Sequence, residues 1–121
     1  MRLRVELDNP HGATVPINHQ EYLTAAVYGL LAKGDGDYAR WLHDEGYAGE
    51  DGKRFKLFTF SGLRAARRTI AGDTLRLPPG PIEWLVASPI EPFLRNLATG
   101  LLSDGVLRVA AATFPIREIR T

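Results

Sequence analysis

The sequence predicts an α+β fold in which strands and helices alternate along the chain. Three observations carry this prediction: an alternating apolar segment at the amino end, two segments with helical spacing, and strand-like apolar stretches between and after them. The chain has 121 residues, of which 45% are hydrophobic, so we expect one domain with a single buried core. No apolar run approaches the roughly 18 residues that span a bilayer, so we expect no contact with a membrane.

The first quarter of the chain predicts a strand followed by a helix. Residues 2–8 alternate in polarity, with their apolar side chains on one face, as in a half-buried strand. Asn18 and Glu21 resemble a capping box, with Asn in place of Ser or Thr. Apolar residues then recur at helical spacing as far as Gly34. These core positions are Leu23, Val27, Leu30 and Leu31.

The middle of the chain predicts a short helix, a loop and a strand. The short helix turns Tyr38, Trp41 and Leu42 inward and stops at Gly46. Residues 47–53 are polar and glycine-rich, which predicts a loop. Residues 54–61 are rich in aromatics and predict a strand, whereas residues 62–72 are basic and poorly patterned.

The last third predicts a hairpin, a helix and a closing strand. Residues 73–77 and 82–87, joined by a Pro-Pro-Gly-Pro turn, predict the hairpin. Ser88, Pro89 and Glu91 predict a capped helix start. Residues 106–119 predict one long or broken strand, with an edge position or bulge at Pro115. The resulting order is βαββαβ, the ferredoxin-like and RRM-like plan of an antiparallel sheet with helices on one face. Such a fold does not by itself decide function.

Charge is distributed unevenly along the chain, although the net charge is only +1. Residues 1–52 carry 4 basic and 9 acidic side chains, and residues 53–121 carry 11 and 5. Six basic residues and no acid fall within 53–72: Lys53, Arg54, Lys56, Arg64, Arg67 and Arg68. Such a cluster binds phosphate or is a solvated basic loop, and the spacing alone leaves both interpretations open.

Several classes of site are absent from the sequence. The chain has no cysteine, which excludes disulfides, cysteine nucleophiles and thiolate metal sites. The acids Asp35, Asp37, Asp44 and Glu45 match no loop ligand pattern such as an EF-hand. No glycine-rich phosphate loop and no serine nucleophile elbow is present. We therefore expect no metal and no cofactor. The amino end enters a strand directly, so we expect no signal peptide and a cytoplasmic protein.

Of the three histidines, His43 is the strongest candidate for chemistry. His11 lies in a Pro/Gly loop and is interpreted as surface, and His19 as a capping or packing residue. His43 falls off the buried stripe of its short helix, beside Asp44, where solvent and a ligand can reach it. Taken alone, an exposed helical histidine is more often idle than catalytic.

Two further residues have both a structural and a functional interpretation. Lys56 interrupts an apolar strand, where lysine is depleted. Its ammonium either extends to water at a strand end or is a fixed cation that faces a phosphate. Tyr28 lies on the flank of the first helix's apolar face, as a core-edge tyrosine or as a hydroxyl that contacts substrate.

Several motifs in order resemble landmarks of one family along essentially the whole chain. They are Val15-Pro16-Ile17-Asn18-His19-Gln20, Val27-Tyr28, Trp41-Leu42-His43, Phe55-Lys56-Leu57-Phe58-Thr59-Phe60-Ser61, Ala87-Ser88-Pro89-Ile90, Leu107-Arg108-Val109 and Thr113-Phe114. The family is that of the CRISPR-associated repeat-processing endoribonucleases, the sixth Cas protein. Its members typically place two ferredoxin-like domains in tandem, with an RNA-gripping glycine-rich loop in the second. The resemblance implies that residues 1–121 are the amino-terminal half of such an enzyme, without its carboxyl-terminal domain.

The resemblance also implies a catalytic set and a reaction. In members with a Tyr–His–Lys site, the three positions resemble Tyr28, His43 and Lys56 here, although the family's catalytic set varies among members. The RNA 2′-hydroxyl would attack the phosphate and leave a 2′,3′-cyclic phosphate and a 5′-hydroxyl, without a metal. His43 would transfer a proton, Lys56 would stabilise charge on the phosphate, and Tyr28 would orient or help deprotonate the 2′-hydroxyl.

The implied partners are the CRISPR repeat RNA and the missing carboxyl-terminal domain, and the resemblance also admits a homodimer. Lys53, Arg54, Arg64, Arg67 and Arg68 would bind the RNA by charge. We expect this chain alone to be weakly active or inactive. Two alternatives remain from the sequence: a non-catalytic ferredoxin-like RNA-binding module, for which no RRM stacking motif is found, and a small structural or oligomerisation domain.

Overall fold

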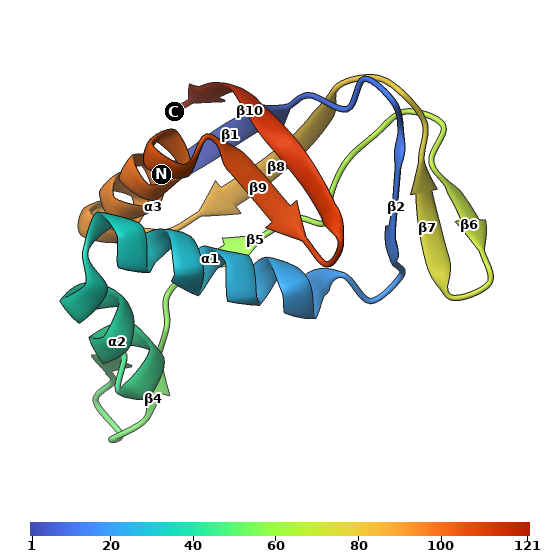
Figure 1. Cartoon of the computed structure of the whole chain (residues 1–121). Coiled ribbons are helices and arrows are strands. Elements are labelled where there is room, and N and C mark those ends of the chain that lie inside the picture. Colours follow the sequence, from blue (N-terminus) through green and yellow to red (C-terminus); the bar gives the residue numbers. More distant parts are fainter.

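A five-stranded antiparallel sheet carries the fold. The computed structural model describes all residues from Met1 to Thr121. The sheet order is β5-β8-β1-β10-β9. Its strands are β1 (Arg2–Leu7), β5 (Thr59–Phe60), β8 (Ile82–Ala87), β9 (Val106–Val109) and β10 (Ala112–Arg120). Two helices, α1 (Gln20–Gly34) and α3 (Glu91–Asp104), pack against each other beneath one face of the sheet (Figure 1).

The predicted ferredoxin-like plan is confirmed. Its four strands are β1, β5, β8 and β10, and its two helices are α1 and α3. The short helix α2 (Gly36–Asp44) is attached to the carboxyl end of α1 and lies outside this plan. None of the three helices combines the length and the apolar character that a membrane-spanning helix needs.

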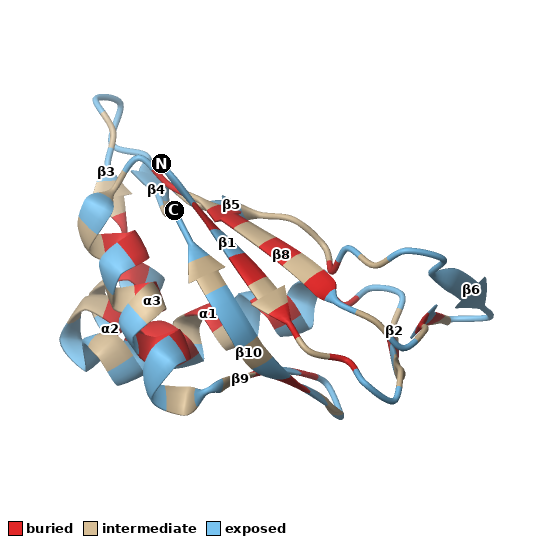
Figure 2. Ribbon diagram, turned by 90° about the horizontal axis from the view of Figure 1, so that it is seen from above, coloured by how far each residue is buried: buried red, intermediate tan, exposed pale blue.

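The core lies between the sheet and the two packed helices. Alternate residues of β1 and β8 are buried, which gives the striped pattern of Figure 2. Val5 and its cross-strand partner Trp84 are both fully buried at the centre. The helices approach closely because Gly100 of α3 has no side chain: a Cβ there would overlap the Leu30 carbonyl of α1. The four predicted core positions of α1 are buried.

The predicted helix caps are wrong at both long helices. His19, not Asn18, is the N-cap of α1, and no side chain caps it. The buried His19 ring fixes this start, because it contacts the Pro16 carbonyl (3.2 Å) and accepts a hydrogen bond from the Leu63 amide (3.3 Å). The helix α3 begins at Glu91, three residues after the predicted cap Ser88.

The predicted hairpin of residues 73–77 with residues 82–87 is also wrong. The strand β7 (Thr74–Leu77) pairs instead with β2 (Ala13–Pro16) and β6 (Thr69–Ala71) in a separate three-stranded sheet, seen at the right of Figure 1. The turn prolines cannot donate to a ladder. The Asn9 side chain binds the Leu77 and Pro78 carbonyls at 3.3 and 3.0 Å, so the chain runs on extended from β7 into β8.

The predicted strand of residues 54–61 is broken. The strand β4 (Arg54–Phe55) pairs with β3 (Tyr47–Ala48), so part of the predicted loop is a small hairpin, whereas β5 pairs with β8. Leu57 separates the two parts, with a φ of 60°.

The predicted closing strand is a hairpin. Ala110, with a φ of 54°, lies between β9 and β10. Pro115 is not at a sheet edge, because β10 lies between β1 and β9. The register against β1 slips at Arg117, two residues later, where the ladder has a bulge.

Candidate active site

The structure brings Tyr28, His43 and Lys56 together. The Tyr28 and His43 rings meet edge to face, with centroids 5.1 Å apart and planes at 83°. The Lys56 ammonium nitrogen lies 2.7 Å from the His43 carbonyl oxygen. One residue comes from α1, one from α2 and one from the segment between β4 and β5. We call these three residues the trio.

The helix α2 presents His43 to solvent. Asp35 caps the helix start, where its Oδ1 accepts a hydrogen bond from the Tyr38 amide at 3.1 Å. Leu42 is fully buried and fixes the rotation of the helix, so the adjacent His43 side chain remains 67% exposed. His43 Nδ1 lies 3.1 Å from Asp44 Oδ1. The ring nitrogen Nε2 makes no hydrogen bond with the protein, and the residue is exposed.

Lys56 closes the carboxyl end of α2. Its ammonium donates to the carbonyls of Leu42 and His43, both at 2.7 Å. These are among the last carbonyls of the helix, which lack intrahelical partners and carry the negative end of the helix dipole. Gly46, with a φ of 77°, lets the segment that carries Lys56 approach closely, because a Cβ there would stand 2.7 Å from the Phe55 carbonyl oxygen and 3.3 Å from Lys56 Cδ. From the sequence, the Lys56 ammonium was expected to face either water or a phosphate. In the structure it also binds the backbone carbonyl of His43.

Tyr28 is half-buried between His43 and Phe58. The Phe58 ring centroid lies 6.0 Å from that of Tyr28. Burial raises the pKa of the Tyr28 phenol. The hydroxyl therefore stays protonated at neutral pH, which suits a hydrogen-bond donor better than a proton acceptor.

The basic residues predicted as one cluster form two separate groups. Lys53 and Arg54 lie on the β3–β4 hairpin, beside α2. Arg64, Arg67 and Arg68 lie on the chain between β5 and β6. The strand β6 lies at the end of the molecule opposite β4 in both Figure 1 and Figure 2, whereas Arg64 still bridges Glu83 of β8 in the central sheet. The trio lies nearer the first group, because Lys56 comes two residues after Arg54.

The second group is partly engaged within the protein. Arg64 forms an ion pair with Glu83 at 3.5 Å. Arg68 donates to the Leu63 carbonyl at 3.5 Å. Arg67 is exposed, makes no ion pair and has a φ of 61°. Arg67 is thus the member of this group with its whole charge facing solvent.

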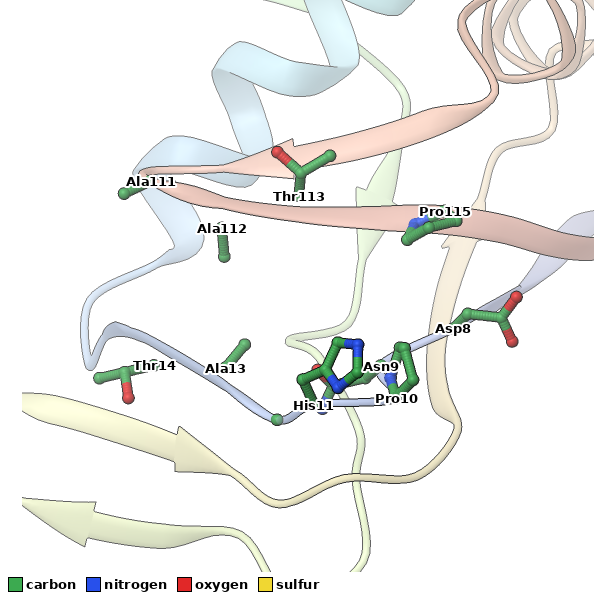
Figure 3. Close-up of a pocket in the computed structure, with 11 residues that line it drawn as sticks. Asp8, Asn9, Pro10, His11, Ala13, Thr14, Ala111, Ala112, Thr113 and Pro115 are labelled. Carbon is green, nitrogen blue, oxygen red and sulfur yellow. The ribbon is translucent and has the colours of Figure 1, made fainter.

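Other parts of the molecule offer no second catalytic cluster. A cavity of about 460 Å³ lies between the β1–β2 connection and the tip of the β9–β10 hairpin (Figure 3). His11, interpreted from the sequence as surface, lines this cavity together with Asp8, and none of the trio does. No group of three or more His, Asp or Glu side chains is placed to hold a metal ion.

Comparison with known proteins identifies the family. Residues 14–120 match the family described as "CRISPR-associated protein Cas6, N-terminal". The chain belongs to the Cas6 family. A curated relative from Methanocaldococcus jannaschii, "CRISPR-associated endoribonuclease Cas6 1", is 33% identical over 120 residues, which cover 99% of this chain and 44% of that protein.

Two solved structures are similar to this chain. One, described as "CRISPR associated protein Cas6", is 33% identical with a TM-score of 0.72, over 99% of this chain and 47% of the other. Another, described as "An RAMP protein binding different RNA substrates", is 16% identical with a TM-score of 0.76, over 99% and 47%, and supports the fold alone. The chain spans about half the length of these Cas6 relatives.

Sequence reasoning did not identify the residues that contact Lys56 and the residue next to it. Gly46 was interpreted as a helix stop, and Ser88 as a helix cap and as part of a family motif. Ser88 is buried and bonds the Leu57 carbonyl next to Lys56. The two partners, Ser88 and Leu57, are 31 positions apart, so no local sequence pattern indicates this hydrogen bond.

Proposed function

We propose that this chain is the catalytic amino-terminal half of a metal-independent endoribonuclease that processes CRISPR repeat RNA. The observation that carries the proposal is that His43 contacts Tyr28 through its ring and Lys56 through its backbone carbonyl, in a chain that belongs to the Cas6 family. The 33% identical relative is named as a CRISPR-associated endoribonuclease.

RNA supplies the nucleophile for this reaction. The 2′-hydroxyl oxygen bonds to the adjacent phosphorus, and the bond from phosphorus to the 5′-oxygen breaks. One proton leaves the 2′-hydroxyl and one is delivered to the departing 5′-oxygen, which yields a 2′,3′-cyclic phosphate and a 5′-hydroxyl. His43 performs one of these transfers, since an imidazole exchanges protons near neutral pH. Such catalysis contributes roughly 10²–10⁴-fold to the rate.

Lys56 stabilises the charge that develops on the phosphate. An ammonium has three N–H donors. Two of them bind the carbonyls at the end of α2, so one remains for a phosphate oxygen. Lys56 can thus bind a phosphate oxygen while it keeps both hydrogen bonds to the end of α2. Tyr28, protonated and at the edge of the His43 ring, orients the 2′-hydroxyl or donates to the phosphate.

The two basic groups hold the RNA backbone on either side of the trio. Lys53 and Arg54 contact phosphates near the cut, and Arg64, Arg67 and Arg68 contact phosphates farther along the strand. Charge contacts of this kind position the RNA and make binding depend on salt.

A second ferredoxin-like domain with a glycine-rich loop completes the RNA cleft. The Cas6 relatives are about twice as long as this chain, which supports that arrangement. The 121-residue chain alone is then weakly active or inactive. We also propose a cytoplasmic location. A homodimer stays a prediction, which light scattering of the chain with and without RNA tests.

The test compares His43→Ala with the double variant Arg67→Ala/Arg68→Ala, each in the chain joined to a carboxyl-terminal Cas6 half. His43→Ala should stop cleavage and leave RNA affinity nearly unchanged, because the proton moves only in the transition state. The double arginine variant should weaken binding and flatten its salt dependence, while bound RNA is still cut.

Two controls probe the chemistry itself. Cleavage should persist in excess chelator, and a 2′-deoxy substitution at the cut site should stop it. A His43→Ala enzyme that cuts at the normal rate refutes the mechanism. RNA binding without any cleavage by the wild-type protein supports the RNA-binding module instead.

A further inference from the structure

The backbone of Leu57 is held in an unfavourable conformation next to Lys56. Its φ of 60° lies in the left-handed region, which leucine rarely adopts because its Cβ crowds the following carbonyl. Leu57 is 39% exposed, so side-chain packing does not explain this conformation. Its backbone, in contrast, makes a specific contact with a buried side chain.

Ser88 supplies that interaction. Its hydroxyl donates to the Leu57 carbonyl at 2.7 Å and accepts from the Ile90 amide at 3.0 Å. The Ser88 amide donates to the Met1 carbonyl at 3.0 Å, and the residue is only 3% exposed. Hydrogen bonds to Met1 and Ile90 therefore fix the position of Ser88, and its hydroxyl in turn fixes the Leu57 carbonyl.

The position of Lys56 follows from this contact. The chain leaves β4 at Phe55, places the Lys56 stem over Gly46, and turns at Leu57. An extended Leu57 would continue the strand and redirect the peptide that carries Lys56. We propose that Ser88 is a positioning residue that holds Lys56 against the end of α2, and through it His43, by fixing the left-handed turn at Leu57.

Amine acetylation followed by mass spectrometry tests the positioning in the chain as it stands. The chain has three lysines, Lys33, Lys53 and Lys56. Without the Ser88 hydroxyl, Leu57 regains its preference of about 5- to 30-fold for other backbone regions. Ser88→Ala should therefore raise the acetylation rate of Lys56 by about fivefold or more relative to Lys53.

A second substitution separates positioning from general loosening. Glycine adopts a positive φ readily, so Leu57→Gly added to Ser88→Ala should return the Lys56 rate toward the wild-type value. A fold that was merely loosened would not be rescued by a more flexible residue. Equal Lys56 rates in wild type and Ser88→Ala, or no rescue by Leu57→Gly, would overturn the proposal.

If Ser88→Ala does not fold, Leu57→Val gives the same test with Ser88 present. A β-branched side chain opposes the left-handed region, so Leu57→Val should also raise the Lys56 rate, and an unchanged rate would overturn the proposal.

The consequence for catalysis rests on the proposed function and is measured separately. With a carboxyl-terminal half restored, Ser88→Ala should lower kcat and leave KM for RNA nearly unchanged, with rescue by Leu57→Gly. If Lys56→Ala itself cuts normally, the proposed role of Lys56 fails while the acetylation result stands. If Lys56→Ala is inactive and Ser88→Ala is fully active, the positioning proposal fails alone.

Discussion

Replacing Lys56 by methionine should destabilise the protein as well as impair cleavage. Methionine keeps an unbranched apolar stem over Gly46, so the change removes mainly the ammonium. Two hydrogen bonds of 2.7 Å to the Leu42 and His43 carbonyls are lost. Hydrogen bonds to charged groups contribute about 1.5–3 kcal/mol each when buried, and a cation at a helix carboxyl end about 0.3–1 kcal/mol. Lys56 is half-buried, so we expect a total loss of roughly 1–2 kcal/mol.

Urea unfolding and hydrogen exchange measure this loss. A loss of that size lowers the urea midpoint by roughly 0.5–1 M. The amides of Glu45 and Gly46, which bond the Trp41 carbonyl at 2.8 and 3.1 Å, should exchange faster as the last turn of α2 opens. His43→Ala is the control: it loses the edge-to-face contact with Tyr28, which contributes about 0.5–1.5 kcal/mol, but keeps the carbonyl that Lys56 binds, so the end of α2 should stay protected.

One pair of results would refute this reasoning. If Lys56→Met unfolds at the wild-type urea midpoint with the end of α2 equally protected, the lysine does not hold the helix. Cleavage lost in that variant would then report only the missing phosphate contact.

Three further predictions concern other parts of the structure. Gly100→Ala should destabilise the protein by about 3 kcal/mol in thermal unfolding, because the added Cβ meets the backbone of α1. Gly29→Ala is the control: its Cβ enters open space on α1, so it should be neutral or stabilising by up to about 1 kcal/mol. His19→Ala should cost about 1–3 kcal/mol in urea unfolding, because the buried Leu63 amide loses its acceptor; an unchanged midpoint would contradict that bond. In an alkaline ultraviolet titration Tyr28 should ionise above the usual range, since its pKa is raised by burial. The folded state disfavours its ionised form, so its contribution to stability is present below pH about 10 and is lost as the pH rises through its folded-state pKa. Burial also raises the pKa of Tyr38, so the assignment is tested by the loss of one late-titrating tyrosine signal when Tyr28→Phe is added to Tyr38→Phe.

The periodicity of apolar residues correctly predicted the strands and helices that bury one face against the core. The alternation in β1 and the helical spacing in α1 placed the core residues correctly, since these periods depend on the backbone alone. The partner of β7 could not be predicted, because the Asn9 side chain, 68 residues away from Leu77, keeps the chain extended where a turn was expected.

For the candidate site, the sequence predicted which residues take part better than it predicted the residues that contact them. Lys56 was conspicuous as a charge in an apolar strand, but nothing local showed that the strand breaks at Leu57. The basic residues of 53–72 are close in sequence and separated in space, because the chain crosses the molecule at the edge of the central sheet between them. The resemblance to the family predicted three residues that the structure brings into contact, and their catalytic roles stay predictions.

The placement of α2 has an evolutionary consequence. The helix and the β3–β4 hairpin are an addition to the βαββαβ scaffold, and the largest buried side chains belong mostly to the scaffold itself. His43 is exposed on this addition, and Tyr28 lies on the outer flank of α1. His43 and Tyr28 can therefore be exchanged at less cost to the fold than Lys56, which also binds the carbonyls at the end of α2. Under the proposed function, selection on a changing RNA substrate can act on this addition while the scaffold is inherited intact, so related chains can diverge in their site residues before they diverge in shape.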